Sequence, residues 1–548
     1  MKNKHLKSVS TSKSFRAFPR PFAAFTAFCA LFLTATIFSC ASTSSLKEGE
    51  ELVEYKKNKY EVLNKKELTE EELRQDCDML KYILYNCYAG IDEAIANGFD
   101  LNSTIDEIYS QALTKKSVGK IPTGDFTAVI HDVMAKNLTN TDQHVSIGGR
   151  SIKPNYAIYY TNIFMQKRDG KFYVKEIREV ETENKKSAVK AQENPDVKIG
   201  MEFTGSESNL YEFMTPGGLE YRYGVFTNKS VRTVQISLEG KNYPVPTSNE
   251  KPISSKYAWT GLKTTNDTLY MSLGDCRQVN GIGEDAENKS FAWDNFTASI
   301  RQSMEGKKNI IFDLRSNPGG RFEYPAKMLT SAYYYKTTDK EKIRDIEKLF
   351  SIIATQDMTE IVSPFTMQTE KELYEKKWKV FFDQMDEERK TYLKNYWKHM
   401  KSRPIRTQIP IKEYSSTLTA FPEPDFKGDI YILINRGTAS ASEYGTDMAY
   451  FLREQGINVH LIGENSWGAY KYGGMNGNSL PNSGIYVSCG LYFGESPSIK
   501  QNKNWLGEGI GFKPDYYAVN DTILSTLILL TKDVELADTL KGLDKEQL

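Results

Sequence analysis

The chain has 548 residues, which is too long for one hydrophobic core and implies about two to four domains. Lysine plus arginine and aspartate plus glutamate number 71 each, so no net field draws the chain towards nucleic acid or anionic lipid. The 33 tyrosines and 27 phenylalanines favour a folded protein over a disordered one.

Residues 1–40 have the layout of an export signal. A basic stretch precedes an uncharged apolar run over 22–38, which is shorter than the roughly 20 residues that span a bilayer. The run ends at Ile37-Phe38-Ser39-Cys40, which resembles the lipobox of bacterial lipoproteins, where the cysteine is lipidated. That resemblance implies a lipid anchor at Cys40 and a place in the bacterial cell envelope, facing the periplasm or the exterior. A plain cleaved signal and an N-terminal anchor are the alternatives, and both also imply export.

The cysteines after the signal predict no disulfide framework. Cys77 and Cys87 fall in one expected helix, which separates them by about 15 Å and prevents a bond between them. Cys276 and Cys489 are isolated in the sequence, and no CxxC pattern of a metal site occurs.

Residues 41–68 are polar and charged, as expected of a tether, and 69–150 are expected to form a helical domain. Thr69-Glu70-Glu71-Glu72 is a capping-box sequence that predicts a helix start. Apolar residues then recur at helical spacing up to Gly90, and further helical patterns cover about 105–113 and 126–138.

Residues 151–260 have a strand pattern instead. Segments 156–160, 171–177 and 231–238 are rich in β-branched and aromatic residues, and 198–203 precede a glycine-rich turn. This order faintly resembles a PDZ-like module, which would capture peptide by strand addition. An unrelated β-rich domain remains the alternative.

Residues 261–530 alternate between strand and helix patterns, which predicts an α/β core with a parallel-rich sheet. A charged, aromatic insertion at about 338–410 interrupts the alternation, and we expect it to be helical. Packing against the core is the simpler role for the insertion, and a lid or partner-binding role is the alternative. Residues 531–548 are expected to be a tail. The expected core elements are strands at 268–273, 309–314, 429–434, 459–462 and near 485–493, and helices at 290–305, 325–334 and 441–454.

Two short blocks follow buried strands of this core. The first, 313–320, ends in Pro318-Gly319-Gly320, where glycine allows a sharp turn and frees backbone N–H groups. Such N–H groups suit a developing oxyanion, so Gly319 and Gly320 are candidate oxyanion-hole residues. Taken alone, a Pro-Gly-Gly sequence indicates only a turn.

The second block, 437–443, places Ser440 between two alanines at the start of a helix. The small neighbours leave room for a substrate carbonyl, and the Ala441 N–H is placed to be a second oxyanion donor. Helix capping is the alternative role for such serines, and we expect it for Ser442.

These blocks resemble the C-terminal processing peptidase and tricorn-core family of serine peptidases over roughly 268–520, apart from the insertion. The shared motifs are Asp313-Leu-Arg-Ser-Asn-Pro-Gly-Gly320, Thr438-Ala-Ser-Ala-Ser-Glu443, the Gly463–Gly468 turn and Glu508–Asp515. The resemblance implies a crotonase-like (ClpP/crotonase) spiral fold, with Ser440 as the nucleophile.

The general base is less obvious. The processing-peptidase branch has a lysine after the turn glycine, where this chain has Ala469. Lys471 is the alternative base, but two residues along a strand move it by about 6.6 Å. The tricorn branch uses a histidine in a pattern similar to Asp142-Gln143-His144, which implies His144 as the base.

A histidine base needs a third group to orient it. In the tricorn-like pattern this group is a late glutamate, which matches Glu508. Glu443 is the second candidate. Gln143 stands where the tricorn core has a serine. This departure puts the full tetrad in doubt and leaves the triad of Ser440, His144 and Glu508.

The leading hypothesis is therefore an exported, lipid-anchored serine endopeptidase that cleaves polypeptide through an acyl-enzyme. The alternative is a degenerate peptidase scaffold that binds peptide or an apolar ligand without turnover, as the missing lysine, Gln143 and the bulky Trp467 suggest. No metal-ligand or nucleotide motif occurs, so no cofactor is implied, and neither is a nucleic-acid partner.

Overall fold

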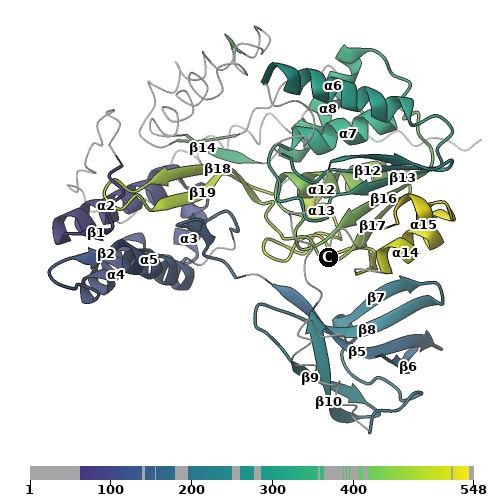
Figure 1. The fold of residues 1–548 in the computed structure, drawn as a ribbon, viewed down its shortest axis with the longest axis horizontal. Coiled ribbons are helices and arrows are strands. Elements are labelled where there is room, and N and C mark those ends of the chain that lie inside the picture. The colour runs from purple at the N-terminus through teal and green to yellow at the C-terminus, as the bar shows by residue number, and fades with distance from the viewer. Residues whose placement is uncertain are drawn as a thin grey trace, which may run out of the picture. The chain divides into compact units, whose positions relative to one another are not determined.

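In the computed structural model, all described residues lie in one compact unit, Lys59–Leu548. The signal, Cys40 and most of the tether lie outside the described residues (Figure 1). The structure describes 62–138, 142–154, 156–178, 196–249, 260–276, 286–355, 358–362, 387, 390, 391, 394, 407–410, 418–495, 497–519 and 522–541.

The N-terminal described region is mainly helical. Thr69 caps α2, and the capping box with Glu72 is present as the sequence predicts. The apolar residues Leu73, Leu80 and Ile83, which recur at helical spacing, are buried on one face. The elements are β1 (Glu67–Leu68), α2 (Glu70–Cys87), α3 (Ile91–Ala96), α4 (Leu101–Thr114), β2 (Ile121–Pro122) and α5 (Thr123–Asn137).

The middle region is antiparallel and β-rich. Its strands pair in the order β7, β8, β5, β10, β9. β6 lies outside this order and pairs with the second half of β5. The predicted strands correspond to β5, β6 and β9, and a PDZ-like role for the region stays a prediction. The strands are β5 (Ala157–Arg168), β6 (Lys171–Ile177), β7 (Leu210–Thr215), β8 (Gly218–Thr227), β9 (Thr233–Leu238) and β10 (Lys241–Asn249).

The core sheet is parallel over five strands, β12, β13, β16, β17 and β20, as the alternating pattern predicts. β11 (Gly261–Thr264) adds an antiparallel edge, and β20 pairs with β7 at Tyr517 and Phe213, so one twelve-stranded sheet runs through both regions. The core strands are β12 (Thr268–Ser272), β13 (Asn309–Asp313), β16 (Asp429–Ile434), β17 (Val459–Gly463) and β20 (Tyr516–Tyr517).

Helices cover both faces of the core sheet (Figure 1). Ile310 and Phe312 face the cluster that includes α6 (Ala286–Gln302), α7 (Glu323–Tyr333) and α12 (Ala441–Glu454), while Ile311 faces α14 (Thr522–Thr531) and α15 (Leu536–Thr539). Burial on both faces explains why these strands read as continuous apolar runs. Leu536 and Leu540 are buried in this core, so the core continues beyond residue 530, into the segment expected to be a tail.

The insertion is not wholly helical, which corrects the expectation from its sequence. It begins with α8 (Lys340–Thr355), but β14 (Thr359–Val362) and β15 (Thr407–Pro410) form an antiparallel pair. β14 also pairs with β19 at Thr359 and Glu360, so the insertion extends the sheet that contains β19.

A second sheet has the order β15, β14, β19, β3, β4, with β18 on the other edge of β19. It joins the strands that follow His144 to the C-terminal part of the core. The strands are β3 (Ser146–Ile147), β4 (Arg150–Ser151), β18 (Tyr472–Ser479) and β19 (Tyr486–Phe493). None of the helices within the described ranges is long and apolar enough to span a membrane.

Asp447 is a buried carboxyl on α12, the helix that begins directly after Ser440. It accepts hydrogen bonds from Ser498 in α13 (Pro497–Gln501) at 2.6 Å, from Asn502 at 3.2 Å and from the Tyr470 hydroxyl at 3.2 Å. Burial raises the pKa of Asp447 to about 6, and these hydrogen bonds oppose the increase.

We therefore expect Asp447→Asn to change how stability depends on pH. Because the pKa is raised on folding, the folded protein binds more protons between pH about 4 and 6, and wild-type stability falls as pH rises through that window. The Asn variant should lose this decline, worth on the order of 3 kcal/mol. Apparent Tm measured from pH 4 to 7 tests this, with the exposed Asp538→Asn as control. A constant Tm difference between Asp447→Asn and wild type would contradict the expectation.

Candidate active site

Ser440 lies at the turn between β16 and α12, half-buried at the carboxyl end of the core sheet. Its backbone has φ 54° and ψ −120°, a conformation that side chains other than glycine rarely adopt. Such a residue costs roughly 1–3 kcal/mol and persists only where its surroundings enforce it. The strained strand-to-helix turn places the hydroxyl 3.3 Å from a ring nitrogen of His144.

The glycine loop packs directly on this turn. A Cβ placed on Gly319 would lie 2.7 Å from the Ser440 Cβ and 2.9 Å from the Ala441 nitrogen, and Gly319 has φ 92°. Ala441 is the first residue of α12, so its N–H has no acceptor within the helix. The Gly319 N–H donates to the Asn317 side chain at 2.9 Å, and it would have to exchange that bond to serve an oxyanion. Gly320 follows in the exposed part of the loop.

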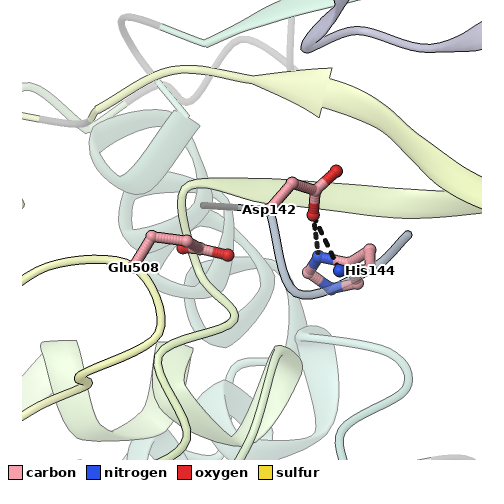
Figure 2. Close-up of side chains that lie close together, drawn as sticks. All are labelled: Asp142, His144 and Glu508. Carbon is pink, nitrogen blue, oxygen red and sulfur yellow. Dashed lines mark hydrogen bonds and ion pairs between the residues drawn. The ribbon is translucent and has the colours of Figure 1, made fainter. Parts of the chain in front are cut away.

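The structure brings His144 to Ser440 from 296 residues away in the sequence. Its Nε2 lies 3.3 Å from the Ser440 Oγ, and its Nδ1 lies 3.2 Å from Asp142 Oδ1 (Figure 2). Asp142 Oδ1 also accepts the His144 backbone N–H at 2.7 Å, an Asx-type turn that fixes the backbone and the ring together. With the Nδ1 proton directed to Asp142, Nε2 is free to accept the serine proton.

Asp142, rather than Glu508, is therefore the carboxylate in contact with the imidazole. The family resemblance implies Glu508 in this role, and in the sequence Asp142 is only part of the Asp142-Gln143-His144 pattern. An aspartate two residues before a histidine is the local signal that could have found it, because such a side chain bonds the backbone two residues on.

Glu508 binds backbone instead. Its carboxyl accepts N–H groups of Gln143 at 3.4 Å, Tyr470 at 3.0 Å and Lys471 at 2.8 Å. Burial, followed by the negative charge of Asp142, raises the pKa of Glu508 well above its ordinary value.

Within the part of the chain that the structure describes, donor atoms of Asp142, His144 and Glu508 lie within 4.8 Å of one another, a spacing that a metal site could use. Both ring nitrogens of His144 already have partners, Ser440 and Asp142. The arrangement fits proton transfer, and we assign no metal to it.

Lys471, the alternative base, lies elsewhere. Its ammonium pairs with Glu93 of α3 at 2.8 Å and with Glu495 at 3.8 Å. The structure gives it no contact with Ser440, because the strand that follows the turn directs the side chain towards the helical region.

Glu443, the second candidate for orienting the histidine, is buried and binds backbone N–H groups of two turns. Its carboxylate accepts N–H groups of Ser440 at 3.1 Å, Gly468 at 2.7 Å and Ala469 at 2.7 Å, and the Ser466 hydroxyl. Burial raises its pKa, and these four donors oppose the increase. It ties the Ser440 turn to the Gly463–Gly468 turn.

Ser442 is not the helix cap that the sequence suggested, because Ser440 occupies the cap position. The Ser442 Oγ lies 2.8 Å from the Asn317 carbonyl and accepts the Ala439 N–H at 2.8 Å. It joins the glycine loop to the Ser440 turn.

Gly319→Ala tests the fit of the loop against Ser440. The added methyl group would displace the serine or the Ala441 N–H, so we expect the rate of labelling by a fluorophosphonate probe to fall by about 10²-fold or more. Gly240→Ala is the matched control, because Gly240 also has a positive φ of 75° but open space around its Cβ position. Both variants should lose about 1 kcal/mol or more of stability. Equal labelling by Gly319→Ala and wild type would contradict the close fit.

Comparison with solved structures gives distant likenesses. Mature CPAF complexed with lactacystin is 13% identical, with a TM-score of 0.40 and coverage of 87% of this chain and 99% of that chain. An S41 protease from Bacteroides fragilis is 12% identical, with a TM-score of 0.30 and coverage of 85% and 96%. Tricorn protease is 12% identical, with a TM-score of 0.30 and coverage of 87% of this chain and 37% of that chain. At these scores the three structures carry no argument about the site.

No curated protein matches the chain. The model of peptidase family S41 matches residues 279–518, a stretch that includes the glycine loop, the Ser440 turn and Glu508. Residues 279–518 therefore belong to peptidase family S41, and the protein is a serine-type peptidase.

Proposed function

We propose that the protein cleaves polypeptide chains internally through an acyl-enzyme, with Ser440 as nucleophile, His144 as general base and Asp142 as the group that orients the base. The single observation that carries this proposal is the continuous chain from Ser440 Oγ to His144 Nε2 and from His144 Nδ1 to Asp142, at 3.3 Å and 3.2 Å. Nucleophile, base and orienting carboxylate in this order can activate a serine hydroxyl.

In the first step the Ser440 Oγ attacks the scissile carbonyl carbon, and its proton passes to His144 Nε2. The Asp142 carboxylate stabilises the imidazolium that forms. The Ala441 N–H and the Gly319–Gly320 loop face the developing oxyanion. The imidazolium then gives its proton to the leaving amine as the carbon–nitrogen bond breaks. Water, deprotonated by the same imidazole, releases the acyl group and restores Ser440.

A binding protein without turnover is the less favoured function. The missing lysine at Ala469 suggested it, but a histidine within 3.3 Å of Ser440 removes the need for that lysine. Trp467 is the bulky residue beside the turn. Its backbone N–H donates to the Thr438 carbonyl at 2.8 Å, which supports the Ser440 turn.

Ser440→Ala, His144→Ala and Lys471→Met separate the possible roles. Fluorophosphonate labelling and cleavage of reduced casein should be lost in Ser440→Ala and should fall by about 10³-fold or more in His144→Ala. Both rates should stay within about threefold of wild type in Lys471→Met, because the ion pair between Lys471 and Glu93 takes no part in proton transfer. Labelling that survives in Ser440→Ala, or that depends on Lys471, would refute the assignment.

We also propose export and a lipid anchor at Cys40, motivated by the basic, apolar and Ile37-Phe38-Ser39-Cys40 pattern. Two or more acyl chains on one cysteine would give stable membrane attachment. Mass spectrometry of protein from a bacterial host should find a mature N-terminus at acylated Cys40, and Cys40→Ala should lack acylation. An unmodified Cys40 in the membrane fraction would refute the anchor.

A further inference from the structure

Glu508 connects two segments that must meet for the site to exist. One is the Asp142–His144 turn, whose Gln143 N–H lies 3.4 Å from Glu508 Oε1. The other follows the Gly463–Gly468 turn, whose Tyr470 and Lys471 N–H groups lie 3.0 Å and 2.8 Å from Oε2. The side chain is only 8% exposed, so it acts as an internal latch between the segment that carries the base and the core.

The charged groups around this latch do not favour an anion. The charges that raise the pKa of Glu508 belong to two other carboxyls, Asp142 and Glu443, and together with burial they raise it well above its ordinary value. A ring nitrogen of His144 also lies within 4.8 Å of the Glu508 carboxyl, and it already has Asp142 and Ser440 as partners. The Lys471 ammonium, in the segment before β18 that supplies two of the N–H donors, is paired with Glu93. Two carboxylates within 4.8 Å in a buried site repel each other strongly (Figure 2).

The remaining elements around the pair add little positive charge. Tyr472 of β18 and Cys489 of β19 are neutral at physiological pH, because burial raises the pKa of each. Lys153 acts on Asp142 and donates to the Leu138 carbonyl at 2.7 Å.

The two oxygens of Glu508 also differ. Oε2 accepts two short N–H bonds, as a carbonyl oxygen does, while Oε1 has a single long contact at 3.4 Å. A proton fits on Oε1, because this oxygen has the weaker of the two sets of hydrogen bonds.

We propose that Glu508 works as an uncharged carboxylic acid that latches the His144 segment to the core, and that Asp142 alone supplies the negative charge facing the imidazole. This inference rests on the proposed function and deepens it. Glu508 is then a positioning residue, and its charge takes no part in proton transfer.

Neutral and apolar replacements test the latch by their effect on fluorophosphonate labelling from pH 6 to 10, with Tm measured in parallel. Glu508→Leu removes the shared acceptor of the Gln143, Tyr470 and Lys471 N–H groups, so the labelling rate should fall by about 10²-fold with a lower Tm. Glu508→Gln keeps the acceptor without a charge and should recover labelling to within about fivefold of wild type. The labelling rate of Asp142→Asn should be about 10²- to 10⁴-fold lower than that of wild type at every pH.

The labelling rate at high pH gives a second readout. Ionisation of Glu508 places two anions together, so wild-type labelling should fall at high pH while Glu508→Gln stays level. A loss of about 10²-fold in Glu508→Gln with an unchanged Tm would overturn the inference, since it would mean that the charge of Glu508 is needed. If the labelling rate falls at high pH equally in wild type and in Glu508→Gln, the inference is overturned as well.

If Glu508→Gln does not fold, the pH dependence of wild-type and Asp142→Asn stability decides instead. Removing the Asp142 charge lowers the pKa of Glu508, so the alkaline loss of Tm should be smaller in Asp142→Asn, and an equal loss overturns the inference. Failure of the proposed function is distinguishable, because then Ser440→Ala and Asp142→Asn would themselves label like wild type.

Discussion

The site depends on one buried carboxylate, Glu443, which holds the Ser440 turn in its strained conformation. It receives the N–H of Ser440 together with N–H groups of Gly468 and Ala469, so three backbone positions from two turns converge on it. Burying a carboxylate is costly, and these donors offset the cost while fixing the geometry. Ser440 can keep φ at 54° because its surroundings, with Glu443 at their centre, over-determine it.

The base reaches this turn through pairing between distant segments. β3, directly after His144, pairs with β19, and the Ala89 N–H bonds the Gly490 carbonyl at 2.9 Å. β19 also pairs with β14 of the insertion, so one strand contacts the base segment and the insertion together. The nucleophile and its base are thus held by separate parts of the chain that meet on a shared sheet.

The sequence predicted most of the core, because strands buried on both faces give continuous apolar runs and α12 follows directly from its serine block. It also selected Ser440 and His144, which the structure places 3.3 Å apart. The contact of Asp142 with the ring was missed, since a two-residue turn has no periodicity to reveal it. Lys471 could not be excluded from sequence alone, because its partner Glu93 lies in a helix 378 residues away. The strands β14 and β15 were missed because each has only four residues and their pairing partners, each other and β19 for β14, are distant in the sequence.

The separation of Ser440 from His144 has a consequence for synthesis. The chain leaves the ribosome with its base first, and 296 residues must follow before the serine appears. At about 5–20 residues per second this interval is roughly 15–60 s, and the Glu508 latch is made later still. The growing chain therefore carries no assembled site for most of its synthesis. The order of the parts along the chain delays activity until Ser440 and Glu508 have both been made.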